Sequence, residues 1–154
     1  MSIVTFYRGH PNPPKTTMGA KLGANAIITC KGKLLLEKRR DSDTWGLVGG
    51  GVKRNETELQ AITREIYEEL GLRVPASSFR KLGVYGEPGR IAAYQDGSVW
   101  RMVIVMFGLE LEEEPTLTIS AESRELRFFN PEELKTIQIV VTHSDIVEDL
   151  FLNR

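Results

Sequence analysis

Three glutamates, Glu65, Glu68 and Glu69, stand close together in the stretch REIYEELGL. If this stretch is helical, their spacing of i, i+3 and i+4 places the carboxylates within about 100° of one another on one face. Like charges at this spacing repel, and neither Glu65 nor Glu68 is followed by a basic residue four positions later. Magnesium would neutralise this face, because it binds carboxylate oxygens together with substrate phosphates. The spacing therefore favours a magnesium site, although most glutamate runs are solvated helix faces.

The helix that carries these carboxylates is expected over about 56 to 70. Asn55 is the expected N-cap with Glu58 as its capping-box partner, and Gly71 suits the left-handed residue that follows a helix. On a helical wheel the apolar side chains share an arc of roughly 80°, away from the carboxylates. These apolar residues are Leu59, Ile62, Ile66 and Leu70.

The segments around the helix predict a mixed sheet. GANAIITC and KLLLEKR, separated by Lys31-Gly32, predict a β-hairpin, and TWGLV predicts another short strand. Further strands are expected in RKLGVYGE, RIAAYQ, SVWRMVIVMFGLEL and ELRFF, and the apolar run VIVMF predicts a strand covered on both faces. NPEEL predicts a short helix capped by Asn130, and SDIVEDLFL predicts a C-terminal helix capped by Ser144. The whole pattern predicts an α/β protein with its sheet between helices.

The stretch GGVKRNETELQAITREIYEELGL resembles the box that defines the Nudix hydrolases, over residues 50–72. The flanking segments KLLLEKRR, TWGLVGGGV and ESRELRFFNPEEL resemble the family more loosely, from about Gly19 to Leu134. Val48 stands where many members have proline, which alters the loop but removes no ligand. The matched box positions are Gly50, Glu56, Arg64, Glu65, Ile66, Glu68, Glu69, Gly71 and Leu72.

The resemblance implies a Nudix-type α/β/α sandwich with a mixed sheet, and hydrolysis of a pyrophosphate bond in a nucleoside diphosphate linked to another group. It implies that Mg²⁺, or Mn²⁺ in its place, binds to the carboxylates Glu65, Glu68 and Glu69 and to the backbone carbonyl of Gly50. A three-glycine run by itself more often marks a turn.

The resemblance also implies roles around the metal. Glu56 and Arg64 match the positions that brace the loop and the helix. The catalytic base varies within the family: Glu65 is one candidate, and Glu122 or Glu125 in ESRELRFF is another. For the last two residues, plain surface charge is an equal alternative.

The substrate is less constrained. Members that cleave ADP-ribose often carry a proline about sixteen residues beyond the box, where this chain has Pro88, but GEPGR also fits a simple turn. We expect ADP-ribose or a nucleotide sugar, with a nucleoside triphosphate or an oxidised nucleotide as the alternative. A Nudix-fold module that senses a nucleotide without cleaving it is a second class, but such modules usually lose box carboxylates, and all are present here.

Composition limits the partners. The 154 residues suit one domain, and 20 basic against 21 acidic residues leave no broad basic surface for polymeric nucleic acid or a membrane. Cys30 is the only cysteine, which excludes an internal disulfide and favours a buried thiol in a reducing compartment. No apolar run could cross a bilayer, so we expect a cytoplasmic protein. His10 and His143 lack a visible catalytic partner, and structural roles are expected for both.

Residues 1–18 are predicted to form an N-terminal arm that precedes a Nudix domain over 19–154. GHPNPPK cannot be helical, and the apolar stretch IVTFY lies outside the box domain. We expect the arm to be dispensable for chemistry and to pack on a second subunit, since it would otherwise expose apolar surface.

Overall fold

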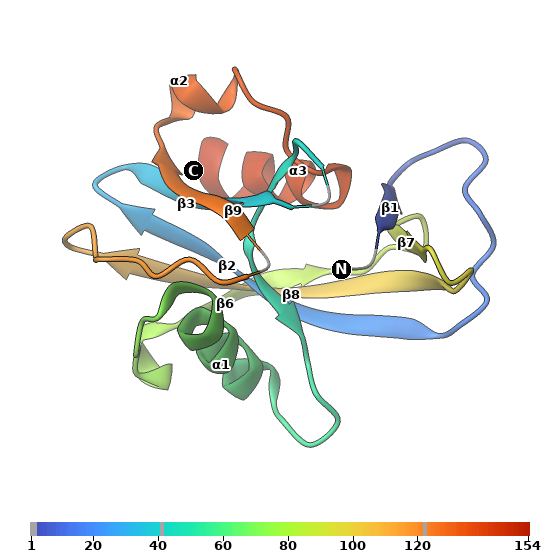
Figure 1. The fold of residues 1–154 in the computed structure, drawn as a ribbon, viewed down its shortest axis with the longest axis horizontal. Coiled ribbons are helices and arrows are strands. Elements are labelled where there is room, and N and C mark those ends of the chain that lie inside the picture. The colour runs from blue at the N-terminus through green and yellow to red at the C-terminus, as the bar shows by residue number, and fades with distance from the viewer. Residues whose placement is uncertain (1–2, 41, 122) are drawn as a thin grey trace.

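The computed structural model describes residues 3–40, 42–121 and 123–154. A curved mixed sheet lies between two helical layers, with α1 on one side and α2 and α3 on the other (Figure 1). The expected α/β/α sandwich is therefore confirmed. Within the described residues, no helix is long and apolar enough to cross a membrane.

The centre of the sheet is a long parallel pair, β2 (Ala20–Cys30) and β8 (Val99–Leu111). Strand β2 also forms the predicted antiparallel hairpin with β3 (Lys33–Arg39). Strands follow the order β1-β7-β8-β2-β3-β4, and β5, β6 and β9 pair with β2, β8 and β3 respectively. Their bounds are β1 Val4–Tyr7, β4 Trp45–Gly46, β5 Val48–Gly51, β6 Arg80–Tyr85, β7 Ile91–Tyr94 and β9 Ser123–Phe129.

The segment TWGLV is not one strand. It is divided at Leu47 into β4, which pairs with β3, and β5, which pairs with β2. The two short strands therefore join different parts of the sheet, and the glycine run belongs to β5.

Helix α1 (Glu58–Leu70) begins two residues later than expected. Thr57, not Asn55, is the N-cap, and Gln60, not Glu58, completes the capping box. A reciprocal Thr-x-x-Gln pair satisfies two free amides, which explains why it defines the start. The predicted end is confirmed, because Gly71 is left-handed with φ 73°.

The other helices cover the opposite face of the sheet. Helix α2 (Pro131–Leu134) is capped by Asn130 as predicted. Helix α3 (Val141–Val147) continues as a π-helix, η2 (Glu148–Leu152), while a short 3₁₀ turn, η1 (Ala76–Ser78), follows α1. The Ser144 cap is wrong: α3 begins directly after Val140, whose amide donates to the carbonyl of Trp45, so the start is set by this link to β4.

Each face of the sheet has its own core. On β8, Val105 and Phe107 point toward α1, and Ile104 and Met106 point toward α3, so the predicted coverage of both faces is confirmed. Cys30 is buried as expected. The apolar face of α1 packs as predicted, with Ile62, Ile66 and Leu70 fully buried and Leu59 partly buried.

The N-terminal segment joins the same sheet. Strand β1 pairs antiparallel with β7, with Val4 opposite Tyr94 and Phe6 opposite Ala92. Val4, Phe6 and Tyr7 of β1 are partly buried, whereas Ile3 just before the strand is 56% exposed. Strands β1 and β7 lie on the right of Figure 1.

Candidate active site

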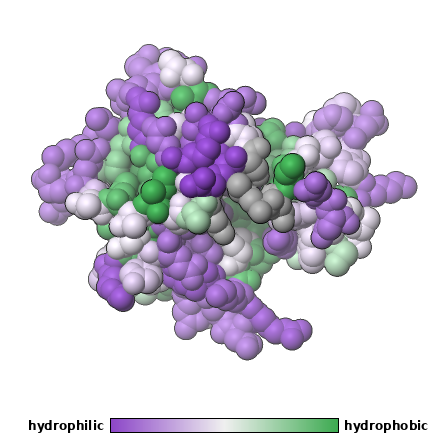
Figure 2. Space-filling model, viewed as in Figure 1, coloured by the Kyte–Doolittle hydropathy of each residue, from purple (hydrophilic) through white to green (hydrophobic). Residues whose placement is uncertain are grey.

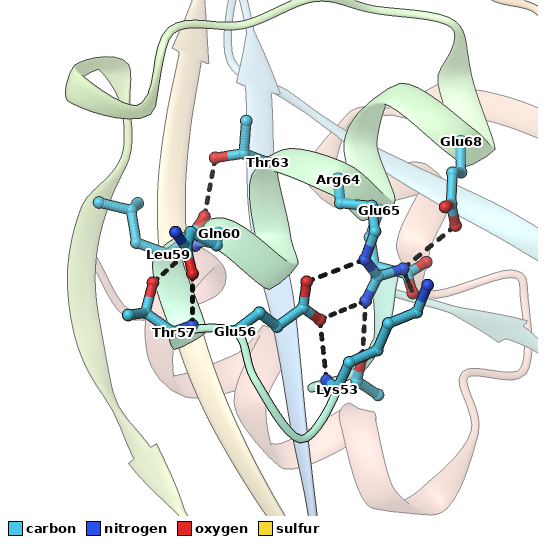
Figure 3. Close-up of polar contacts among 10 residues, drawn as sticks. Lys53, Glu56, Thr57, Leu59, Gln60, Thr63, Arg64, Glu65 and Glu68 are labelled. Carbon is cyan, nitrogen blue, oxygen red and sulfur yellow. Dashed lines mark hydrogen bonds and ion pairs between the residues drawn. The ribbon is translucent and has the colours of Figure 1, made fainter.

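Arg64, in the middle of α1, is the centre of a polar network that reaches the loop before the helix (Figure 3). Its Nε donates to Glu56 Oε2 at 3.0 Å, and one terminal nitrogen donates to Glu56 Oε1 at 2.6 Å and to the Gly51 carbonyl at 3.0 Å. Glu56 Oε1 also accepts from the Lys53 amide at 2.8 Å. These bonds lower the pKa of Glu56 to about 2, the Arg64 hydrogen bonds being the main cause. The bracing positions implied by the resemblance therefore join the loop after β5 to the helix.

The same arginine also reaches the acidic face. Its other terminal nitrogen donates to Glu65 Oε1 at 2.8 Å and to Glu68 Oε2 at 3.1 Å. No basic residue follows these acids by four positions, but Arg64 precedes Glu68 by four and offsets part of the repulsion on this face. Figure 2 shows a strongly hydrophilic surface over α1 and the loop before it.

Glu69 behaves differently, because it is only 5% exposed. Its Oε2 is buried and receives no hydrogen bond. Burial first, and then the neighbouring carboxylates of Glu37 and Glu65, raise the pKa of Glu69 well above its ordinary value. An acidic group has thus been buried among other acids, which is costly unless a proton or a cation is present.

The glycine run brings backbone against these acids. A Cβ on Gly50 would lie 2.5 Å from Glu65 Oε1, so only glycine leaves room for that carboxylate. Gly49 has φ 149°, and a Cβ there would lie 2.2 Å from the Ala24 carbonyl oxygen. The run therefore serves close approach, both to β2 and to the acids of α1.

A cavity of about 680 Å³ opens beside this cluster. Glu37 of β3 and Glu69 of α1 line one part of it, whereas Phe6 of β1 and Tyr94 of β7 line another. Strands β7 and β3 are separated by β8 and β2, which corresponds to roughly 14 Å at about 4.8 Å per strand. The other lining residues are Val4, Lys21, Leu22, Gly23, Asn25, Arg39, Arg40, Leu47, Gly49, Gly50, Gly51, Met102, Ile104, Ala121 and His143.

Two positively charged side chains lie over aromatic rings that line this cavity. Lys21 Nζ donates to the Tyr94 hydroxyl at 2.8 Å and lies 4.4 Å from the ring centroid. The Arg39 guanidinium lies 5.0 Å from the Phe6 ring centroid. Flat rings with adjacent positive charge suit a heteroaromatic base and a phosphate.

Leu47, between β4 and β5, is fixed by hydrogen bonds to both of its backbone groups. The Leu47 amide donates to His143 Nδ1 at 3.0 Å, and Asn25 Nδ2 donates to the Leu47 carbonyl at 3.1 Å. Burial, with added repulsion from Arg39 and Arg90, lowers the pKa of His143 to about 3, so this imidazole is neutral and accepts the bond. The structural role expected for His143 is confirmed. His10, on the surface, accepts from the Asn12 amide.

Of the two later candidates for the base, Glu125 is not brought to the cluster. Leu126 and Phe128 point toward α1, and the alternation along β9 sends Glu125 to the opposite face, where it is exposed. Glu122 lies outside the described residues. Pro88 lies in an exposed turn and does not line the cavity.

Several cavity residues were missed from the sequence, including Glu37, Lys21 and Tyr94. For Glu37 a signal existed: Leu35 and Glu37 share one face of the strand KLLLEKR, so alternation places a carboxylate on a core-facing row. For Lys21 and Tyr94 no local pattern marks a ligand site, because pairing across the sheet brings them together.

The oxygen ligands present in this cluster suit a divalent cation. Glu69 Oε2 is buried without a hydrogen bond, Glu65 contacts the Gly50 backbone, and all side-chain donors are hard oxygens. Across residues 3–40, 42–121 and 123–154, however, no three acidic, histidine or cysteine side chains already have metal-ligand geometry. Arg64 donates to one oxygen of Glu65 and one oxygen of Glu68, so a cation would compete with the arginine for these two atoms.

A family model described as NUDIX domain matches residues 20–150. The chain belongs to the Nudix family. An ADP-ribose pyrophosphatase of Methanocaldococcus jannaschii is 31% identical to this Nudix chain over 83% of its length and 71% of the relative's. An RNA pyrophosphohydrolase of Hydrogenovibrio crunogenus is 46% identical, but over only 37% of this chain and 33% of the relative.

Solved structures show the same fold. A bifunctional NMN adenylyltransferase/ADP ribose pyrophosphatase from Francisella tularensis, complexed with AMP and a Mn ion, aligns with a TM-score of 0.71 at 18% identity. The alignment covers 94% of this Nudix chain and 43% of that one. The first curated relatives are likewise matched over only 33% and 39% of their length.

Proposed function

We propose that this chain is a divalent-metal-dependent hydrolase that cleaves a pyrophosphate bond in a nucleoside diphosphate linked to another group. The observation that carries the proposal is the buried Glu69 carboxylate beside Glu65 and Gly50, at the side of a cavity that also holds aromatic rings and cations. Such a cavity suits a nucleotide whose phosphates face the acids and whose base faces Phe6 and Tyr94.

The residues that would hold Mg²⁺ or Mn²⁺ are Glu65, Glu68 and Glu69, with the Gly50 carbonyl. The cation supplies neutralisation of the phosphates and Lewis acidity toward phosphoryl oxygens. Glu56 and Arg64 keep the loop after β5 in place against the helix. Among the candidate bases Glu65 is favoured, since it contacts Gly50 and Glu69, whereas Glu125 faces away.

ADP-ribose or a nucleotide sugar is the proposed substrate class. A relative matched over 83% of this chain is named an ADP-ribose pyrophosphatase, which supports this choice. The alternatives are a nucleoside triphosphate or an oxidised nucleotide, since other relatives carry such names.

The test is a substrate panel with Mg²⁺ and product identification. ADP-ribose, UDP-glucose, dGTP, 8-oxo-dGTP and a 5′-triphosphorylated RNA are each incubated with the purified chain. Release of AMP and ribose 5-phosphate from ADP-ribose is the expected result. Tight binding of ADP-ribose without turnover of any compound would instead support the nucleotide-sensing module.

A further inference from the structure

Glu37 lies outside the box but beside its carboxylates. It extends from β3, between β4 and β9, with Gly46 and Leu126 as its partners in the two ladders. On the same face of β3, Leu35 is fully buried against the α1-side core. Glu37 therefore points from a rigid part of the sheet toward α1, and it lines the cavity together with Glu69.

The carboxylate of Glu37 has a polar contact from β9. Ser123 Oγ donates to its Oε2 at 2.7 Å. The carboxylate of Glu69 lies near it, since Glu37 is one of the groups that raise the pKa of Glu69, and both side chains line the cavity. Two ionised carboxylates repel each other and neither can donate a hydrogen bond, so a cation bound at this pair is stabilising.

The environment of Glu69 gives independent evidence that a ligand binds here. Its side chain is 95% buried, and its Oε2 receives no hydrogen bond from any described residue. Buried polar atoms are nearly always partnered, so an unpartnered carboxylate oxygen beside a cavity points to a ligand that supplies positive charge.

We propose that Glu37 is a further carboxylate ligand, which binds a divalent cation together with Glu69. The proposal rests on the proposed function, and it adds to the box a ligand from the sheet. Ser123 has the role of a positioning residue, because its hydroxyl donates to one oxygen of Glu37.

The test is equilibrium binding of Mn²⁺ without nucleotide, followed by electron paramagnetic resonance and by calorimetry. Glu37→Gln keeps the size of the side chain, and we expect Mn²⁺ affinity to fall at least 10-fold. Glu69→Gln should lower it as much, and Glu110→Gln, an exposed change on β8, should leave it unchanged. Ser123→Ala should give a smaller loss, which Ser123→Thr restores.

Thermal melting gives a second readout that needs no activity. Without metal, Glu37→Gln should melt at or above the wild-type temperature, because an acidic group next to Glu69 has been replaced by a neutral one. Mg²⁺ should raise the melting temperature of Glu37→Gln by less than it raises that of the wild type. Wild-type Mn²⁺ affinity in Glu37→Gln, with loss in Glu69→Gln, would overturn this proposal and leave the proposed function intact. Absence of both Mn²⁺ binding and turnover in the wild type would overturn both.

Discussion

His143 of α3 accepts a hydrogen bond at Nδ1 from the backbone amide of Leu47, 96 residues earlier and three residues before Gly50. Since Asn25 holds the Leu47 carbonyl at the same time, the approach to the glycine run is fixed at both backbone groups. The C-terminal helix therefore helps to set the position of a proposed metal ligand.

Acid should weaken the fold through this imidazole. The folded chain keeps His143 neutral down to about pH 3, whereas the unfolded chain protonates it near 6.5. The unfolded state then binds more protons, so the free energy of unfolding falls as pH drops below 6.5, by up to about 1.4 kcal/mol per pH unit. Urea titrations between pH 7 and 5 measure this slope. It should flatten in His143→Gln but not in His10→Gln, a change on the surface.

Substitutions of the neighbouring acids Glu68 and Glu69 should have different effects on turnover and on stability. Glu68→Gln and Glu69→Gln should each reduce kcat by orders of magnitude, since each removes a charged oxygen ligand. Without metal, Glu69→Gln should raise the melting temperature at pH 7. The folded pKa of Glu69 is raised, so the wild type loses stability as pH rises above 4.5, and glutamine avoids this loss.

Glu68 is half exposed and bonded to Arg64, so Glu68→Gln should leave that melting temperature nearly level. Magnesium should raise the wild-type value more than that of either variant. Wild-type rates and magnesium dependence in both variants would mean that this face is only a solvated helix surface.

Adjacent glycines provide a matched pair. Gly50→Ala places a methyl group against Glu65 Oε1, although its backbone conformation tolerates alanine. We expect a loss of turnover of at least 10-fold and weaker Mn²⁺ binding, because the carboxylate must move. Gly51→Ala meets nothing within 4 Å and should behave as wild type. Equal activity of the two variants would show that Glu65 does not need this position.

Arg64→Lys tests whether the hydrogen bonds between Arg64, Glu56 and Gly51 are needed for activity. Lysine keeps the charge but cannot donate to both oxygens of Glu56 and to the Gly51 carbonyl. We expect kcat to fall on the order of 10- to 100-fold. The pKa of Glu56, now about 2, should rise toward 4.5, so its contribution to stability is lost at higher pH during acid denaturation. Arg54→Lys, in the exposed loop before α1, is the control.

The N-terminal strand should matter for binding. Phe6 and Val4 line the cavity, so the expectation that this segment is dispensable for chemistry can be tested at Phe6. Phe6→Ala should raise KM roughly 10-fold with a smaller change in kcat, as expected for loss of a ring that stacks on a base. Thr5→Ala, on the exposed opposite face of β1, should change neither constant. Calorimetry with AMP and ribose 5-phosphate adds a direct check: only AMP should bind more weakly to Phe6→Ala.

Local patterns predicted most of the elements correctly. The Lys31-Gly32 hairpin, the Asn130 cap and the buried face of α1 depend on neighbouring residues, and all were confirmed. The Thr57 cap was missed because Asn55 and Glu58 have the same spacing as Thr57 and Gln60, and only backbone geometry distinguishes the two.

The candidate site was predictable only where it lies on one helix. The spacing of Glu65, Glu68 and Glu69 follows from the sequence, but the burial of Glu69 depends on packing against β3. Glu37 and Tyr94 reach the cavity from strands distant in sequence, so no local window contains them with the box.

The parallel pairing of β2 with β8 also governs how the chain can fold. It joins residues roughly 80 positions apart, so β2 has no such partner until synthesis has passed Leu111. At about 5–20 residues per second, α1 is complete several seconds before that moment. During this interval Ala24, Ala26 and Ile28 lack the strand that covers one edge of β2. Until β8 is available, this edge of β2 is open to pairing with other chains, which favours aggregation. The cavity is lined by residues of both halves and cannot be complete before then.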